Sequence, residues 1–156
     1  MGELCLQETY APLGECFGCG PYNERGLKVR SIPRGEGEVV AQWEPERHHV
    51  SLAESAISSG IVATLLDCHS NWTAAWHLMQ RDHADRPPCV VTSEYSVRHL
   101  APASSKDKCW LVARIVHAGE RWAKVEAHLE SNGKVCATAR GTFVVVDEGQ
   151  PGFHRW

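Results

Sequence analysis

The chain has 156 residues, of which 43% are hydrophobic and 22% charged, and its formal net charge is −3. This length suits one compact domain, residues 1–156, and the composition excludes intrinsic disorder. The charge balance disfavours nucleic-acid binding, and no apolar run approaches the ~18–20 residues that cross a bilayer, so we expect neither a nucleic-acid nor a membrane partner.

The seven cysteines predict free thiols rather than a disulfide framework. Their number is odd, the chain is not small, and no basic-then-apolar signal segment precedes Cys5. We therefore expect a cytoplasmic location. Most of these cysteines lie in apolar surroundings, as Cys109 and Cys136 do, where a thiol packs as a small hydrophobe.

The first third of the chain predicts little regular structure. Residues 1–26 carry repeated glycines and prolines, which do not support a long helix or a central strand, and we expect them to wrap over the domain surface. Residues 27–32 and 38–43 are predicted to be two short strands, joined by a loop of hairpin length at 33–37.

Residues 57–80 predict the one long helix, because apolar residues recur there at spacings of three and four. A second row of the same helix is polar and runs along a different face. The apolar row is Ile61, Leu65, Cys68, Trp72, Trp76 and Met79, and the second row is Gly60, Thr64, Asp67 and Asn71.

After the helix the hydrophobic period changes to two. Residues 90–98, 109–117, 121–129 and 134–146 are predicted to be strands, with short turns at 118–119 and 132–133. No further helix is available for parallel crossovers, so the sheet is expected to be antiparallel. The whole chain then predicts an α+β domain in which a curved sheet, ending in a meander over 90–146, packs on one central helix.

This arrangement resembles the hotdog fold, and three motifs make the resemblance specific. Residues 60–67, Gly-Ile-Val-Ala-Thr-Leu-Leu-Asp, resemble the signature of PaaI-like and 4-hydroxybenzoyl-CoA-type thioesterases. Residues 16–20, Cys-Phe-Gly-Cys-Gly, followed by Asn23 and Gly26-Leu27, are similar to the opening of one branch of that superfamily. Residues 98–102, Arg-His-Leu-Ala-Pro, and the final strands also match, so the resemblance covers essentially the whole chain.

The resemblance implies catalytic roles for five residues. Asp67 stands where the family has the helix carboxylate that acts as nucleophile or general base on an acyl-CoA thioester. Ser59, and with it Gly60, would supply the backbone N–H groups that polarise the thioester carbonyl, and Ser58 stands where the family has histidine. Thr92 matches a hydroxyl that positions the attacking water in some members.

Substrate contacts are expected along the polar row and after the helix. Thr64 and Asn71 lie beside Asp67 on that row. Arg98 and His99, with Lys106 and Lys108, are candidates for the phosphates of coenzyme A, and a solvated charged surface is the alternative. The resemblance also implies a homo-oligomer, either a dimer with sheets paired edge to edge and shared sites, or a tetramer.

Two other groups of reactive residues offer alternatives to this thioesterase site. Cys68 and His69 project about 100° apart on a helix and cannot pair as nucleophile and base. Cys16 and Cys19 have zinc-ligand spacing but lack two ligands, for which His48 and His49, or residues of a partner chain, are the candidates. We expect no metal and no cofactor.

We conclude that the sequence predicts an acyl-CoA thioesterase. The alternatives are a non-catalytic acyl-thioester binder, in which the altered turn at 58–59 keeps affinity without turnover, and a structural zinc-bearing oligomer.

Overall fold

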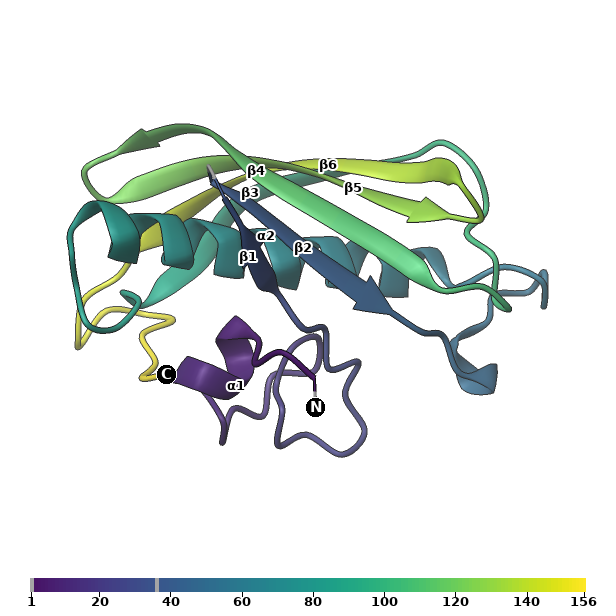
Figure 1. The fold of residues 1–156 in the computed structure, drawn as a ribbon, viewed down its shortest axis with the longest axis horizontal. Helices are drawn as coiled ribbons and strands as arrows, with labels where there is room; N and C mark the ends of the chain where they lie inside the picture. The colour runs from purple at the N-terminus through teal and green to yellow at the C-terminus, as the bar shows by residue number, and fades with distance from the viewer. Residues whose placement is uncertain (1, 36) are drawn as a thin grey trace.

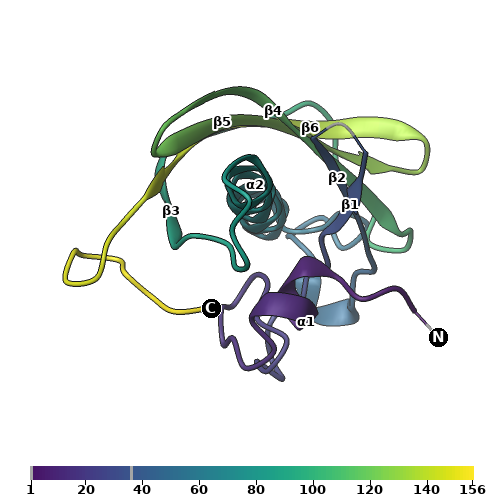
Figure 2. The same cartoon turned by 60° about the vertical axis from the view of Figure 1, so that its left-hand side comes forward.

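The computed structural model describes residues 2–35 and 37–156, and its centre is helix α2, Ser59–Arg81, held in the curve of an antiparallel sheet (Figures 1 and 2). This is the expected α+β hotdog arrangement, and the helix predicted at 57–80 is confirmed. The strands are β1 Ile32–Arg34, β2 Glu38–Trp43, β3 Val90–His99, β4 Cys109–Gly119, β5 Trp122–Ser131 and β6 Lys134–Val145. Two short helices, α1 Leu6–Tyr10 and the 3-10 turn η1 Arg47–His49, complete the described elements.

The strand order corrects the predicted meander over 90–146. The sheet runs β1-β2-β4-β5-β6-β3, so only β4, β5 and β6 form a meander. Strand β3 does not pair with β4; residues 100–108 carry the chain across the sheet, and β3 pairs with β6 at the far edge. Alternating hydrophobicity identifies a strand and its buried face but not the neighbour with which it pairs. The other side of β3 has no strand partner among the described residues.

The predicted strand at 27–32 is wrong over most of its length. Lys28 has φ 53°, which interrupts an extended run, and strand β1 starts only at Ile32. Leu27 and Val29 are nevertheless buried, which explains why the segment has a strand-like pattern. The strand runs through Pro33, which a sheet tolerates at an edge. The predicted loop at 33–37 is therefore shorter, and Glu36 within it lies outside the described residues.

The two predicted turns have different outcomes. Asn132 and Gly133 have φ values of 52° and 73°, as the predicted tight hairpin turn requires. The turn expected at 118–119 lies instead at 120–121, because β4 continues through Gly119.

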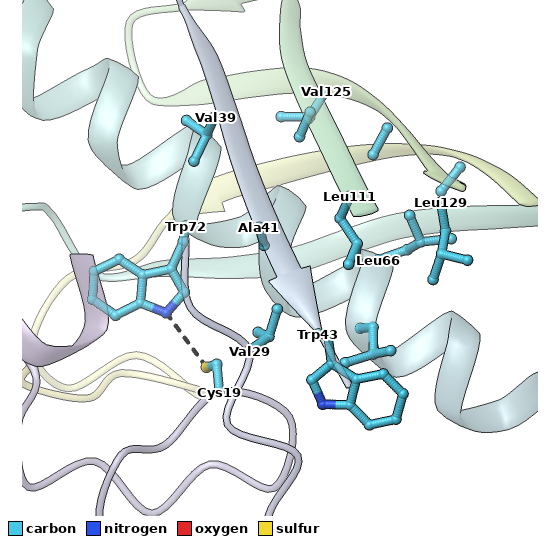
Figure 3. Packing of buried hydrophobic residues seen from close by; sticks show 14 of the residues in the cluster. Cys19, Val29, Val39, Ala41, Trp43, Leu66, Trp72, Leu111, Val125 and Leu129 are labelled. Atoms are coloured by element: carbon cyan, nitrogen blue, oxygen red, sulfur yellow. Dashed lines mark hydrogen bonds between the residues drawn. The ribbon is translucent and has the colours of Figure 1, made fainter. Parts of the chain in front are cut away.

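The core lies between α2 and the concave face of the sheet. Because the sheet curves round the helix, burial extends beyond a single stripe, and Leu65, Leu66 and Trp72 are almost completely buried. Leu66 lies near the inward side chains of Leu111 and Leu129, whereas Trp72 lies beside Cys19 (Figure 3). No helix in residues 2–35 and 37–156 is long and apolar enough to span a membrane.

His69 is the largest polar side chain of α2 inside this core. Its Nδ1 lies 2.8 Å from Ser31 Oγ, and its Nε2 lies 2.9 Å from the Val39 carbonyl oxygen. Burial lowers the pKa of the ring to about 4, so the imidazole is neutral at physiological pH. This confirms that His69 is a packed histidine and not a partner for Cys68.

The two ends of the chain close the side of α2 that the sheet leaves open. In Figure 2, α1 and the C-terminus lie on the side of the helix opposite the sheet. Residues 1–26 were predicted to be irregular surface; α1 is short, as that composition allows, but Cys5 and Leu6 are buried. At the other end, the ring of Trp156 lies 4.2 Å from that of Trp72, between centroids.

Candidate active site

A cavity of about 730 Å³ lies between α2, the start of β3 and the two ends of the chain. The helix contributes Asp67 and Asn71 of its polar row and Cys68 and Trp72 of its apolar row, and the strand contributes Thr92. Most of the remaining wall is apolar, so the cavity suits an apolar chain attached to a polar reacting group. The apolar lining includes Tyr10, Pro12, Leu13, Trp72, Val90 and Trp156.

Asp67 and Thr92 meet at the wall of this cavity. The Thr92 hydroxyl donates a hydrogen bond to Asp67 Oδ1 over 2.8 Å. A β-bulge interrupts the pairing of β3 between Thr92 and Glu94, and such irregularities change the direction of a side chain beside a site. Burial raises the pKa of the Asp67 carboxyl, and the Thr92 hydrogen bond opposes that rise. The structure thus brings together two of the residues assigned to catalysis.

The two other members of the polar row have different positions. Asn71 lines the cavity one turn beyond Asp67, and its Nδ2 donates to the Val90 carbonyl oxygen over 3.1 Å. Thr64 donates its hydroxyl to the Gly60 carbonyl of its own helix over 2.9 Å and is not among the cavity-lining residues. Asn71 therefore remains a candidate for substrate contact. The Thr64 hydroxyl is instead used in a hydrogen bond within its own helix.

The proposed carbonyl-binding turn lies at the N-terminal end of the helix, about two turns before Asp67. Ser58 is the N-cap residue, and Ser59 and Gly60 open the first turn. The N–H groups of Ser59 and Gly60 have no protein acceptor among the described residues, so they remain available to an oxyanion. Ser59 precedes Asp67 by eight residues, which places it about 12 Å away along the helix axis. One chain does not bring these donors to its own carboxylate.

Arg98 and His99 lie away from the cavity. They are at the end of β3, six or seven residues beyond Thr92, which corresponds to roughly 20 Å of extended chain. Arg98 lines a groove on the outer face of the sheet with Arg114 and Arg140. The structure therefore does not join this pair to Asp67 within one chain.

Two cationic side chains at the cavity, those of Arg86 and Arg155, were not singled out from the sequence. Arg86 lines it and donates to the carbonyl oxygens of Tyr10 and Trp156 over 3.1 and 3.2 Å. Nothing in the local sequence distinguishes Arg86 from other loop arginines, because its position depends on contacts with both ends of the chain.

Three cysteines form a cluster in the same cavity wall. The sulfur atoms of Cys16, Cys19 and Cys68 all lie within 4.8 Å of one another. Sequence analysis paired the first two with His48 and His49, but His49 packs against Trp43 and its Nδ1 accepts from the Glu46 N–H over 2.8 Å. Cys68 was assigned to the apolar row of the helix, and no local spacing connects it with residues about fifty positions earlier.

The three thiols of the cluster influence one another's pKa values. Hydrogen bonds from the thiols of Cys19 and Cys68 lower the pKa of Cys16, and the same interactions raise the pKa values of Cys19 and Cys68. Cys16 is the exposed member of the three. The three sulfur atoms are therefore placed to bind one group that has affinity for thiolate ligands.

Comparison with known proteins identifies the family. The family model described as the thioesterase superfamily matches residues 51–137, which include Asp67 and Thr92. No curated protein sequence matches the chain significantly.

Solved structures agree with this assignment. A thioesterase superfamily protein from Shewanella loihica is 27% identical, with a TM-score of 0.63 over 76% of this chain and 91% of that one. A Streptococcus mutans protein, determined with bound acetyl CoA, is 18% identical, with a TM-score of 0.62 over 76% of this chain and 88% of its own. Another thioesterase superfamily protein, 19% identical with a TM-score of 0.68 over 83% of this chain, is longer, and this chain spans 62% of its length.

Proposed function

Because the chain belongs to the thioesterase superfamily, we propose that it is an acyl-CoA thioesterase whose reacting carboxylate is Asp67. The observation that carries this proposal is the Asp67–Thr92 pair at the wall of an apolar cavity. A partly buried carboxylate in such a wall is costly unless it is paired with a cation or used in chemistry, and Asp67 has no cationic partner among the described residues.

The geometry suits attack on a thioester carbonyl. Thr92 holds Oδ1, and no protein donor in the described part of the chain reaches Oδ2. That free oxygen either removes a proton from water as the water adds to the carbonyl carbon, or adds to the carbon itself. In both routes the carbon–sulfur bond breaks, the thiol leaves with a proton, and water supplies the oxygen of the released acid.

The carbonyl oxygen requires donors that one chain does not supply. Reacting groups must approach within about 3–3.5 Å, whereas Ser59 and Asp67 are about 12 Å apart along the helix. We therefore place the N–H groups of Ser59 and Gly60 of a second copy beside Asp67 of the first. The ten-residue edge of β3, which pairs only with β6 among the described strands, offers a backbone for joining two copies.

The residues around the N-terminal end of α2 favour coenzyme A as the thiol that carries the acyl group. The Ser105 N–H donates to the Ser55 carbonyl oxygen over 2.9 Å, which holds the exposed Lys106 and its loop beside the first turn of α2. A nucleotide phosphate there would meet positive charge while the acyl group enters the cavity. All seven cysteines are free, which supports a reducing, cytoplasmic setting.

The test measures free-thiol release from short-chain, long-chain and aromatic acyl-CoA substrates. Asp67→Asn is expected to lower turnover by at least about 10²-fold while substrate binding persists. The matched control is Asp82→Asn, the same change at the exposed C-cap of the same helix, which is expected to keep full activity. Ligand-induced stabilisation without thiol release by the wild-type protein would refute the proposal and establish a non-catalytic binder.

A further inference from the structure

We propose that Cys16, Cys19 and Cys68 bind one Zn²⁺ ion, with its fourth coordination position open to the cavity. The site is distinct from the hydrolytic machinery and does not depend on the proposed function. Its effect would be to fix the N-terminal segment on α2, next to the helix turn that carries Asp67.

The sulfur positions fit tetrahedral zinc. With Zn–S bonds of about 2.3 Å, two ligands of a tetrahedron lie about 3.8 Å apart. The Sγ atoms of Cys16 and Cys68 are 3.8 Å apart, and all three sulfurs are within 4.8 Å of one another. Cys16 and Cys19 also have the two-residue spacing common in structural zinc sites. A small contraction around Cys19 completes three corners of the tetrahedron.

N–H groups lie close to the sulfur atoms of the cluster. The indole Nε1 of Trp72 donates to Cys19 Sγ over 3.4 Å (Figure 3). The backbone N–H groups of Gly18 and Cys19 lower the pKa of Cys16. Such outer-shell donors orient ligands and offset their charge in metal sites.

The backbone is shaped so that the loop can reach the helix. A Cβ added to Gly18 would collide with Cys68 Sγ and would come within 2.9 Å of Thr64 Cγ2. The Leu27 and Val29 N–H groups donate to the carbonyl oxygens of Phe17 and Gly18 over 2.7 and 3.0 Å, which pins the loop from its outer side. The loop is therefore held against Cys68, the one cysteine of α2. It makes this contact at Gly18, where a side chain would prevent it.

Zinc is favoured over a disulfide by the number and placement of the sulfurs. A disulfide uses two cysteines and would leave the third thiol beside it without a role. The cysteines on this cavity wall lie on two segments separated by about fifty residues, so a shared ion joins them without the strict geometry of an S–S bond. The exposed side of Cys16 leaves room for water as fourth ligand.

The experiment measures metal content and coordination independently of hydrolysis. Full-length protein is stripped with a chelator under reducing conditions, reloaded with Zn²⁺ or Co²⁺, desalted and analysed for metal per chain. The wild-type protein is expected to hold about one ion and to give the thiolate-to-cobalt absorption of a sulfur-rich tetrahedral site. Zinc should also raise the melting temperature of stripped protein.

Single serine replacements locate the ligands. Cys16→Ser, which changes the exposed member, and Cys68→Ser are each expected to weaken zinc binding by at least about 100-fold, more than loss of an outer-shell partner causes. Cys5→Ser is the matched control: Cys5 is the N-cap of α1, where serine is a preferred residue, so this variant should fold and retain its metal.

Three results would overturn the zinc proposal. They are a wild-type protein that takes up no stoichiometric metal and shows no cobalt–thiolate band, equal metal retention in Cys68→Ser and Cys5→Ser, and a Cys16–Cys68 disulfide that persists in reductant. None of these results bears on thiol release, so failure of the zinc site and failure of the thioesterase are distinguishable.

Discussion

Subunit mixing tests whether the reacting carboxylate and the carbonyl donors come from different chains. Ser59→Pro removes one donor N–H with little cost to the fold, because Ser59 is the first helical residue, where proline is favoured. Ser58 has φ −52° and ψ 130°, a conformation compatible with a following proline. Removal of one oxyanion donor is expected to lower kcat by about 10²–10³-fold. Asp67→Asn is expected to be nearly inactive for a separate reason, because it removes the proposed reacting carboxylate.

The expected activity of mixed dimers follows from counting sites. If each site combines Asp67 of one chain with Ser59 of the other, a heterodimer of Asp67→Asn and Ser59→Pro has one intact site and one doubly defective site. Random mixing of equal amounts yields heterodimers as half of all dimers, so the mixture should recover about a quarter of wild-type activity. Two nearly inactive preparations would then become active on mixing.

The control places both substitutions on the same chain instead of one on each chain. A chain carrying both substitutions is paired with a wild-type chain through two affinity tags. With shared sites this heterodimer has no intact site and is inactive, whereas sites built within one chain would leave it half active. Light scattering must first show a dimer or a larger assembly. Recovery in the second pairing and not in the first, or full turnover by a monomer, would refute the shared-site geometry.

Three single substitutions test other parts of the structure. Thr92→Val removes the hydrogen bond to Asp67 with little change of shape, and it is expected to lower kcat about tenfold, the equivalent of about 1.4 kcal/mol. Thr92→Ser keeps the hydroxyl and should retain activity. An equal loss of kcat in both variants would contradict the role of the hydroxyl. His69→Leu removes the ring partner of the Val39 carbonyl and one of the two partners of the Ser31 hydroxyl, which keeps its bond from Gln7 Nε2. Urea denaturation should therefore show a loss of about 2–3 kcal/mol, and an unchanged midpoint would contradict the buried network. Gly18→Ala should cost about 1–3 kcal/mol through overpacking against Cys68, whereas Gly2→Ala, with no atom within 4 Å of the added Cβ, should cost nothing measurable.

Periodic features of the fold were predictable because they depend on local sequence. The spacing of apolar residues gave α2 to within two residues at each end, and alternation gave the four long strands with small errors at their ends. The pairing of β3 with β6 was not predictable in this way. It depends on how residues 100–108 cross the sheet, which no local period records. Lys28, with its positive φ, likewise broke a strand that the hydrophobic pattern alone would continue.

The site was predictable where a motif covers contiguous residues and unpredictable where distant segments meet. Asp67 followed from an eight-residue signature, and Thr92 from the resemblance of the following strand; the structure brings them within 2.8 Å. Arg98, chosen for its charge, lies on the outer face of the sheet. Charge alone does not tell which face of a strand a residue occupies when a bulge between Thr92 and Glu94 shifts the alternation.

The adjacent residues Asp67 and Cys68 show how one helix can serve two unrelated purposes. Their side chains project about 100° apart, so Asp67 reaches β3 while Cys68 reaches the loop of Cys16 and Cys19. Both nevertheless line one cavity, because the N-terminal segment and β3 flank the helix on neighbouring sides. A loop anchored at Cys68 by the proposed ion would fix the wall beside the Asp67 carboxylate without contacting it.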